Sequence, residues 1–408
     1  MDPIYNFGIR AYRAAVRLAS CKNRKARLML QGQSQTFEIL REKLDPKQQY
    51  IWIHSSSLGE FEQARPLIEM IKEKQPESRI VLSFFSPSGY EVRKDYNLAD
   101  AVCYLPFDLS GNVKRFLDIV RPKMAIFVKY EFWGNYLMEL HRRNIPTYII
   151  SAIFRENQVF FKPWGGMFRQ MLGCFDTLFV QNEESCKLLD GIGIKNVVVT
   201  GDTRFDRVAT VRAATREFPL IEQMVSDAKF TFVMGSSWQP DEDIVIPYFN
   251  SHPEMKLILA PHEFDRERLL ELMGRINRKS VLYSQAHIND MTEVDCLIID
   301  SFGLLSSLYR YGQAAYVGGG FGSGIHNINE AAVYGIPVIF GPRYQKFREA
   351  CDLVAREGSF SITNAEEFAN HMDRLLSDAD YLRHTGEIAA GYIKENLGAT
   401  QRIYDRIF

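Results

Sequence analysis

The sequence has few of the residues that build disulfide frameworks or metal centres. Its six cysteines contain no C-x-x-C pair, which argues against a disulfide framework and a zinc site and suits a reducing cytosol. Its eight histidines show no metal-ligand spacing, and His262-Glu263 lacks the second histidine of an H-E-x-x-H motif. We therefore expect no bound metal.

Neither sign of charge dominates the chain. The 49 lysines and arginines are balanced by 50 acids, so no global field attracts nucleic acid, and none is expected as a partner. With 46% hydrophobic and 24% charged residues, the composition is that of an ordinary globular protein. The 408 residues are enough for two or three domains, each with its own core.

Two glycine motifs of nucleotide-binding enzymes are also missing. No G-x-G-x-x-G follows the first predicted strand, and G-x-x-x-x-G-K-[ST] does not occur. A dinucleotide-dependent dehydrogenase and a P-loop NTPase are therefore disfavoured.

The N-terminal residues contain no apolar run near the roughly 18 residues that a membrane span needs, and no signal-peptide h-region. They are basic instead, because seven arginines and lysines before residue 28 face one acid, Asp2. Apolar residues such as Ile4 and Phe7 interleave with these bases at partly helical spacing. Two interpretations fit: an interfacial helix lying on anionic lipid, and a solvated helix packed on the following domain.

From residue 50 onward, short apolar runs alternate with amphipathic stretches, as in YIWIHSS, EFEQARPLIEMIKEK and RIVLSFF. This alternation predicts an α/β fold with parallel sheets. We predict two doubly wound domains facing a cleft, with ligands at the carboxyl ends of the strands. The predicted divisions are a basic helical segment (1–45), a first domain (46–208), a linker (209–228), a second domain (229–390) and a C-terminal helix (391–408) with room to pack back on the first domain.

The segment from Gly318 to Pro342 places a glycine cluster between a predicted strand and a predicted helix. Amides at such a helix start bind anions, and glycines let a phosphate approach, with Glu330 in reach of a sugar diol. The alternative is a packed turn in which Asn327 caps the helix and Glu330 complements its dipole. The residues alone leave both interpretations open.

Two acids follow predicted strands of the first domain. Glu60 lies three residues after Ser57 in HSSSLGE, which fits a capping box and equally a base that the helix dipole keeps ionised. Glu131 in VKYEFWGNY is either a loop acid beside Trp133 or a second cleft carboxylate, as in sugar chemistry.

Other polar residues also follow predicted strands. Ser236 and Ser237 are candidates for hydrogen bonds to an anionic donor, and Arg204 for offsetting negative charge on a leaving group. The acidic run from Asp241 to Asp243 follows Pro240 at a predicted helix start, which favours capping over metal binding.

Several segments together resemble, in order and spacing, those of the bacterial 3-deoxy-D-manno-octulosonic acid (Kdo) transferases: HSSSLGE, EFWGNYL, GDTRFD, GSSW, LAPHE, DSFGLLSSLYRYGQAAYVGGGF, HNINEAAVYGIPVIFGP and FRE. The resemblance implies a GT-B glycosyltransferase with two Rossmann-like domains and no metal or organic cofactor. Such an enzyme transfers Kdo from CMP-Kdo to a lipid A precursor (lipid IVA-like) in lipopolysaccharide biosynthesis, at the cytoplasmic face of the inner membrane. The basic N-terminus would then hold the enzyme on the anionic membrane that carries its acceptor.

Carried onto this sequence, the resemblance implies that Glu60 is the general base of an inverting transfer and that Glu131 stabilises the transition state. Arg204 stands where the family usually has lysine. CMP binding would fall on Pro261, His262, Phe302, Gly303, Leu304, Asn327, Ile328, Asn329 and Glu330.

The sequence departs from the family near Pro261, where an arginine is missing. Either Arg266 or Arg268 substitutes, or helix amides hold the CMP phosphate. Two other functional hypotheses stay open beside a Kdo transferase. One is a GT-B glycosyltransferase or sugar-nucleotide 2-epimerase that uses a UDP- or GDP-sugar, and the other is a non-catalytic sugar-nucleotide or lipid-binding module.

Overall fold

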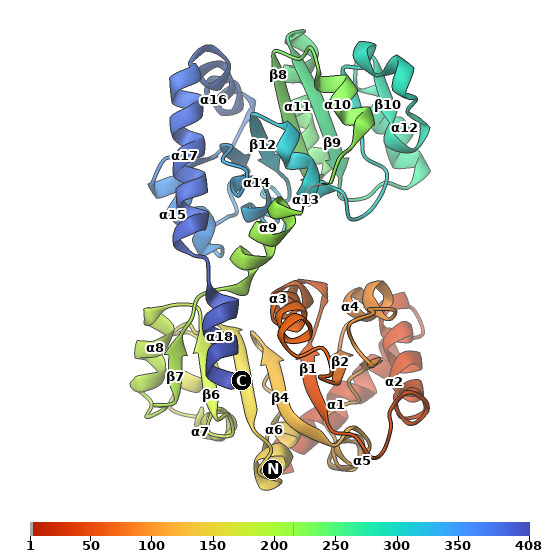
Figure 1. Cartoon of the computed structure of the whole chain (residues 1–408), viewed down its shortest axis with the longest axis vertical. Helices are drawn as coiled ribbons and strands as arrows, with labels where there is room; N and C mark the ends of the chain where they lie inside the picture. The colour runs from red at the N-terminus through yellow and green to blue at the C-terminus, as the bar shows by residue number, and fades with distance from the viewer. Residues whose placement is uncertain (1–2, 215) are drawn as a thin grey trace. The chain divides into compact units, whose positions relative to one another are not determined.

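The computed structural model describes residues 3–214 and 216–408, and the chain forms two compact units. Unit 1 takes in Met1–Arg207 and Leu397–Phe408, and unit 2 takes in Val208–Asn396. Within the described residues, each unit is built on one seven-stranded parallel sheet with helices between successive strands (Figure 1). The predicted α/β class with two doubly wound domains is therefore confirmed.

The sheet of unit 1 has the order β3-β2-β1-β4-β5-β6-β7. Its strands are β1 (Tyr50–Ser55), β2 (Ile80–Phe84), β3 (Ala101–Tyr104), β4 (Pro122–Val128), β5 (Thr147–Ala152), β6 (Thr177–Val180) and β7 (Val197–Val199). Its helices are α1 (Pro3–Ala19), α2 (Arg24–Lys43), α3 (Leu58–Lys74), α4 (Pro87–Arg93), α5 (Ser110–Val120), α6 (Gly134–Arg142), η1 (Val159–Phe161), α7 (Gly166–Leu172), α8 (Glu183–Asp190) and α18 (Ala399–Ile407). Helix α9 (Thr203–Ala213) begins in this unit.

Strand β1 shows why the sequences of the central strands are continuous apolar runs. All six of its residues are buried, because helices cover both faces of the sheet. Ile51 and Ile53 pack with residues of α3 and α18 on one face. The Trp52 ring packs on the other face, 4.9 Å from the Phe116 ring of α5 and 5.4 Å from the Tyr136 ring of α6, measured between centroids.

The sheet of unit 2 has the order β10-β11-β9-β8-β12-β13-β14. Its strands are β8 (Phe230–Ser237), β9 (Met255–Pro261), β10 (Ser280–Leu282), β11 (Cys296–Ile298), β12 (Ala314–Val317), β13 (Val338–Phe340) and β14 (Ser359–Ser361). Its helices are α10 (Pro219–Val225), α11 (Gln239–Ser251), α12 (Arg266–Gly274), η2 (Tyr283–Gln285), η3 (Ile288–Glu293), α13 (Leu305–Leu308), η4 (Tyr309–Tyr311), α14 (Asn329–Ala332), α15 (Arg348–Ala355), α16 (Ala365–Ser377) and α17 (Ala379–Glu395).

The divisions differ from the predicted ones in three places. The expected linker 209–228 holds the end of α9 and all of α10, and Ile221 and Met224 of α10 are fully buried, so this stretch is part of unit 2. The expected N-terminal segment 1–45 contributes α2, whose Leu40 is fully buried in the core of unit 1. The expected helix 391–408 is two helices, because Gly398 takes the left-handed conformation between α17 and α18.

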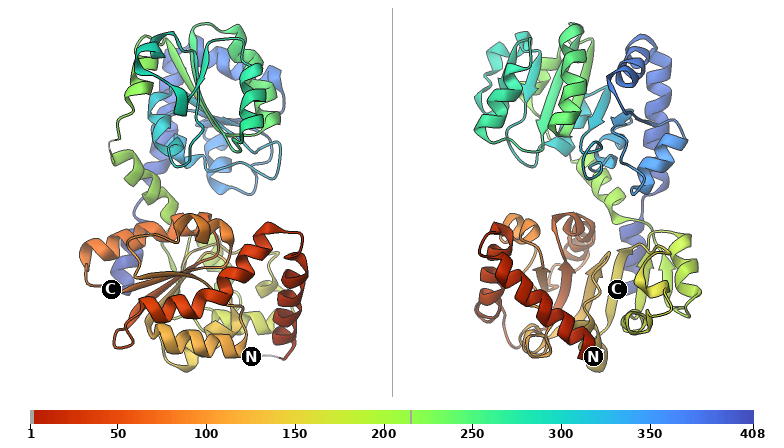
Figure 2. Two further views of the ribbon diagram at one scale, coloured as in Figure 1. Left: turned by 90° about the vertical axis from the view of Figure 1, so that its right-hand side faces the viewer. Right: turned by 180° about the vertical axis from the view of Figure 1, so that it is seen from behind.

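Helices α1 and α2 lie against each other at one side of unit 1 (Figure 2). Asn23 caps α2, since its side chain accepts a hydrogen bond from the amide of Ala26. Unlike α2, helix α1 has no buried residue. Among residues 3–214 and 216–408, none of the helices combines the length and the apolar character that crossing a bilayer requires.

Candidate functional site

The strand order of unit 1 places a topological switch point between β1 and β4. Ligands of such sheets bind outside the carboxyl ends of the two strands that flank this point. His54 lies near the carboxyl end of β1, and Glu131 lies in the loop that follows β4. Lys129 of the same loop has φ 65°, a left-handed conformation that is unusual for a non-glycine residue and that clusters at functional sites.

His54 and Glu131 form a buried pair. Their Nε2 and Oε2 atoms are 3.0 Å apart, with His54 fully buried and Glu131 7% exposed. The indole Nε1 of Trp133 donates to the same carboxylate oxygen at 2.6 Å. On the other side of the ring, Nδ1 of His54 lies 3.1 Å from the carbonyl oxygen and 2.9 Å from the hydroxyl of Ser83 on β2. Glu131 is thus held in a fixed orientation by two donors.

His54 and Ser83 carry no predicted role from the sequence. Each interrupts an apolar strand with a polar residue near its carboxyl end, in YIWIHS and IVLSF, and the two strands are parallel neighbours. That pattern marks the pair, but the sequence does not state that β1 and β2 are adjacent. Nε1 of Trp133 also lies 3.2 Å from Nε2 of His54, so the ring stands between Ser83 on one side and Glu131 with Trp133 on the other.

Glu60 opens helix α3 and forms the capping box that its spacing predicts. The amide and the hydroxyl of Ser57 both donate to Oε2 of Glu60, the amide at 3.0 Å. The side chain is partly exposed, and no described residue donates to its Oε1. The capping and base interpretations are therefore compatible, because the cap fixes one oxygen and leaves the other toward solvent.

Arg204 is held by a buried acid at the start of α9. Its Nε donates to Oδ2 of Asp202 at 2.8 Å, and Nε2 of Gln63 donates to Oδ1 of the same carboxylate at 2.9 Å. Burial raises the pKa of Asp202, but Arg204 and the other donors outweigh it, so the pKa lies below its ordinary value. Since Gln63 follows Glu60 by three residues on α3, this network joins the helix of the candidate base to Arg204.

In unit 2, the glycines of the segment 318–342 serve close backbone packing. A Cβ on Gly318 would lie 2.3 Å from the carbonyl oxygen of Ser236, and one on Gly320 would lie 2.6 Å from the backbone of Gly341. The helix expected after the glycines, α14, has only four residues. The close packing agrees with a packed turn, but the N-cap residue of α14 is Ile328 rather than the expected Asn327, and so short a helix gives little dipole for an anion site.

Asp241 ties this glycine segment to α11. Its carboxylate accepts from the amide of Trp238 at 2.9 Å, the amide of Gly319 at 3.0 Å and the hydroxyl of Tyr316 at 2.9 Å. This arrangement confirms the capping role. Burial raises the pKa of Asp241.

The two candidate serines at the end of β8 differ. Ser237 is 2% exposed and donates its hydroxyl hydrogen to Glu242 at 2.9 Å, so that hydrogen is committed within the protein. Ser236 is partly exposed and has φ 52°, a strained conformation at a strand end. Arg268 also binds Glu242, which is fully buried. Arg268 therefore neutralises this carboxylate, which disfavours it as the substitute for the missing arginine.

Three rings form a stack beside these loops. The rings of Trp238 and His262 lie 4.5 Å apart at 28°, and those of His262 and His326 lie 4.7 Å apart at 32°. Burial and the neighbouring His262 lower the pKa of His326 to about 4, so this ring is neutral at physiological pH. The stack was not predicted from the sequence. A flat aromatic surface of this kind suits a planar base.

The predicted nucleotide residues around α14 lie together. Ser306 donates to Oε2 of Glu330 at 2.5 Å, and the side-chain amide of Asn327 donates to Oε1 at 3.2 Å. Asn329 is fully buried, and neither polar atom of its side chain has a hydrogen-bond partner among the described residues. A buried amide without partners is costly, which makes Asn329 a candidate for a ligand contact. Ile328 is fully buried beside it.

The remaining predicted nucleotide residues lie on two neighbouring loops. Phe302 is 84% exposed, and its ring lies 4.5 Å from that of Phe264, which follows β9. Gly303 has φ 81°, and Leu304 and Pro261 are buried. Within the described residues, no three His, Cys, Asp or Glu side chains converge as a metal-binding group.

The comparisons with known proteins agree with one another. Residues 24–207 match the family model described as "3-Deoxy-D-manno-octulosonic-acid transferase (kdotransferase)". The chain is 28% identical to the 3-deoxy-D-manno-octulosonic acid transferase of Aquifex aeolicus over 84% of its length and 91% of the relative's. It is 25% identical to that of Haemophilus influenzae over 88% and 87%, respectively.

Solved structures match the fold at low identity. A UDP-GlcNAc 2-epimerase from Neisseria meningitidis aligns with a TM-score of 0.62 at 15% identity, over 88% of this chain and 99% of that one. MurG of Acinetobacter baumannii aligns with a TM-score of 0.55 at 12% identity, over 88% and 99%. The architecture is thus the GT-B type with two Rossmann-like domains. Along most of its length the chain is thus similar to 3-deoxy-D-manno-octulosonic acid transferases, and residues 24–207 match the family's own model.

Proposed function

We propose that this protein transfers Kdo from CMP-Kdo to a lipid A precursor, with Glu60 as the general base and with inversion at the anomeric carbon. The similarity to 3-deoxy-D-manno-octulosonic acid transferases supports the reaction class. The observation that supports the base is the geometry of Glu60, whose Oε2 is fixed by Ser57 at a strand end while Oε1 receives no hydrogen bond from the described residues. A fixed carboxylate with one open oxygen suits removal of a proton from an acceptor hydroxyl.

In this proposal the acceptor hydroxyl, once deprotonated by Glu60, attacks the anomeric carbon of Kdo. The bond to the CMP phosphate breaks as the new glycosidic bond forms, so one displacement inverts the configuration. Glu131, oriented by His54 and Trp133, places negative charge where the sugar becomes electron-poor. Arg204 offsets charge on the departing phosphate.

Unit 2 is proposed to hold the CMP moiety. The ring stack of Trp238, His262 and His326 offers a flat surface for the cytosine. Glu330 accepts from the ribose hydroxyls, and the unpaired amide of Asn329 donates to the ligand. No metal or organic cofactor takes part in the proposed reaction.

The protein is proposed to act at the cytoplasmic face of the bacterial inner membrane, with α1 lying on the anionic surface. Three large apolar side chains of α1 are exposed to solvent, namely Ile4 (76%), Phe7 (73%) and Leu18 (78%). Exposed apolar residues on a basic helix are typical of an interfacial segment. Of the two interpretations of the N-terminus, the interfacial one accounts for this exposure.

The proposed function is tested by transfer from CMP-Kdo to a lipid IVA-like acceptor, with Glu60→Gln as the diagnostic variant. Glutamine replaces glutamate in a capping box, so α3 keeps its start while the base is lost. We expect the rate to fall by about 100-fold or more. Glu73→Gln, an exposed change at the far end of α3, is the matched control. A Glu60→Gln enzyme with an unchanged rate would refute the assignment.

The same assay separates the alternatives. An enzyme that uses a UDP- or GDP-sugar would be stabilised against heating by UDP or GDP and not by CMP. A binding module would show stabilisation by CMP without any transfer.

A further inference from the structure

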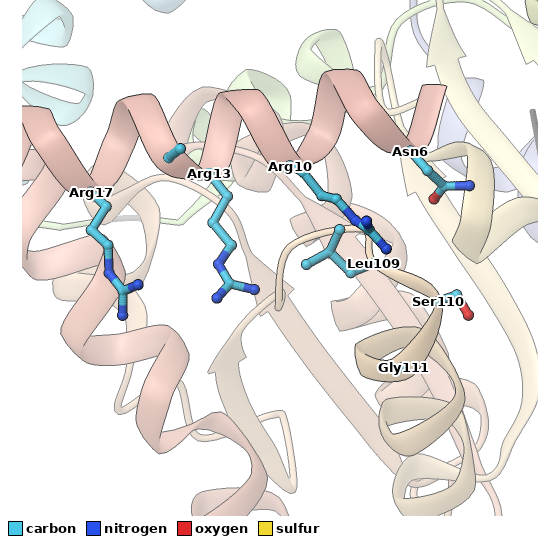
Figure 3. Close-up of a pocket in the computed structure, with 8 residues that line it drawn as sticks. Asn6, Arg10, Arg13, Arg17, Leu109, Ser110 and Gly111 are labelled. Atoms are coloured by element: carbon cyan, nitrogen blue, oxygen red, sulfur yellow. The ribbon is translucent and has the colours of Figure 1, made fainter. Parts of the chain in front are cut away.

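A pocket of about 730 Å³ opens between α1 and the start of α5 in unit 1. Arg10, Arg13 and Arg17 of α1 line one side, and Ser110 and Gly111 of α5 line the other. Figure 3 shows the three arginines projecting from the same side of α1, with the end of Arg10 beside Leu109. Every charged residue of this pocket is an arginine. We call it the arginine pocket.

The helical period gives α1 three separate stripes. At 100° per residue, Arg10, Arg13 and Arg17 fall within an arc of about 60°. Ile4, Phe7, Ala11, Ala15 and Leu18 fall within another arc of about 80°, and all five are exposed. The third stripe holds the residues that dock α1, such as Tyr5 and Val16. The arginine row therefore lies beside the apolar stripe rather than within it.

The positive charge of the arginine pocket is not neutralised by the protein. Residues 3–214 and 216–408 give Arg10, Arg13 and Arg17 no carboxylate partner. Helix α5 adds to this charge, since it is eleven residues long and its N-cap residue, Leu109, offers no side-chain acceptor to the first amides. Three guanidinium groups and a helix start thus face one space.

A second pocket of about 340 Å³ shares Arg13 and Arg17 with the first. Arg115 is its other charged residue, and Gln33 of α2 also lines it. Gln33 is 8% exposed, its Oε1 accepts from the amide of Phe107 at 3.2 Å, and its Nε2 has no partner in the described part of the chain. A buried donor without an acceptor is an independent indication of a ligand that brings oxygen atoms.

We propose that the arginine pocket binds the phosphate monoester headgroup of a membrane lipid. Arginine forks bind phosphate oxygens in pairs, and every charged group that lines the pocket is such a fork. A monoester, with a charge of about −1.5 to −2 and three terminal oxygens, uses more of these donors than a diester with one charge. The acyl chains of the same lipid then lie beside the apolar stripe of α1.

The inference rests on the proposed membrane-bound function only in taking a lipid as the carrier of the phosphate. It is tested without CMP-Kdo, by sedimentation of the full chain with phosphatidylcholine vesicles that contain phosphatidic acid or phosphatidylglycerol at equal zeta potential. We expect the chain to bind the phosphatidic acid vesicles at least about fivefold more tightly, because general attraction to negative charge is matched. Free inorganic phosphate should reduce this preference.

Two variants remove the proposed site in different ways. Arg10→Gln/Arg13→Gln/Arg17→Gln deletes the cations, and the matched control Lys22→Gln/Arg24→Gln/Lys25→Gln removes the same charge from exposed positions outside both pockets. Gly111→Glu instead inserts a carboxylate, and Gly111→Ala is its control. A Cβ at Gly111 meets no atom within 4 Å, and an acid in the first turn favours the helix, so the variant should fold.

We expect the triple arginine variant and Gly111→Glu to bind the two vesicle types equally. Their two control variants should keep the preference for phosphatidic acid. Equal binding of the unmodified chain to both lipids would overturn it, because general electrostatics would then suffice. So would a preference that survives in Gly111→Glu. Since Glu60→Gln should leave vesicle binding unchanged, failure here is distinguishable from failure of the proposed reaction.

Discussion

The hydroxyl of Tyr5 donates a 2.6 Å hydrogen bond to the carboxylate of Asp108, which lies 103 residues further along the chain. The same carboxylate accepts from the amides of Asn135 and Tyr136 at the start of α6, at 2.9 and 3.0 Å. The amide of Gly134 donates to the Tyr5 hydroxyl at 2.9 Å. The buried carboxylate of Asp108 therefore fixes both the start of α6, which follows Glu131 in the chain, and the docking of α1.

We predict that Tyr5→Phe loosens α1 without unfolding unit 1. A hydrogen bond to a charged group contributes about 1.5–3 kcal/mol, and its loss here acts on one exposed helix. Hydrogen exchange of the α1 amides should accelerate by about tenfold or more. Tyr12→Phe is the control, because it keeps the ring that stacks on Phe85. Unchanged exchange in Tyr5→Phe would show that this bond does not hold the helix.

The pH dependence of stability should carry a contribution from Asp108. Burial raises the pKa of this carboxyl from its ordinary value of 3.8 to about 6 in the folded chain, although its three donors oppose the shift. The folded state thus binds the proton more tightly, so stability falls as pH rises from about 4 to 6, by about 3 kcal/mol. The difference in unfolding free energy between the unmodified chain and Asp108→Asn should show this slope. A flat difference would contradict it.

The orientation of Glu131 predicts a graded effect on transfer. Glu131→Gln removes the charge and should lower kcat by about 100-fold. Trp133→Phe removes only one donor to the carboxylate and should lower it by about tenfold. Steady-state kinetics with CMP-Kdo would check both, and circular dichroism would check the fold. Equal losses in the two variants would contradict a direct role for the charge.

Asn329→Leu should separate ligand binding from stability. Because the buried amide lacks partners, an apolar side chain of similar size should raise the unfolding free energy of the free protein by about 1 kcal/mol. The Kd for CMP should rise by about tenfold. Thr200→Val is the control, because it removes a buried and unpaired hydroxyl from unit 1. It should leave CMP binding unchanged. A destabilised Asn329→Leu that binds CMP normally would assign Asn329 a structural role.

Removal of divalent cations should leave transfer unchanged, as the proposed reaction uses none. Activity measured with and without excess EDTA checks this prediction. A loss that Mg²⁺ restores would contradict it.

Much of the fold follows from local sequence. The apolar runs around Trp52 and Phe127 predict buried parallel strands, and the spacing from Phe61 to Ile71 predicts the buried face of α3. The capping role of Glu60 could be predicted because its motif is local, with Glu60 three residues after Ser57. His54, Ser83 and the stack of His262 with His326 escaped assignment, since they meet only once strands or loops distant in sequence become neighbours.

The sequence by itself determined the α/β class, the resemblance to the Kdo transferases and the basic, amphipathic character of α1, because periodicity and motifs act over short separations. Only the tertiary structure decided which residues face one another. It paired His54 with Glu131 across 77 residues, docked Tyr5 on Asp108, and turned three arginines toward the start of α5. The physical reason is that strand order and helix docking arise from burial of apolar faces, which many local patterns satisfy equally.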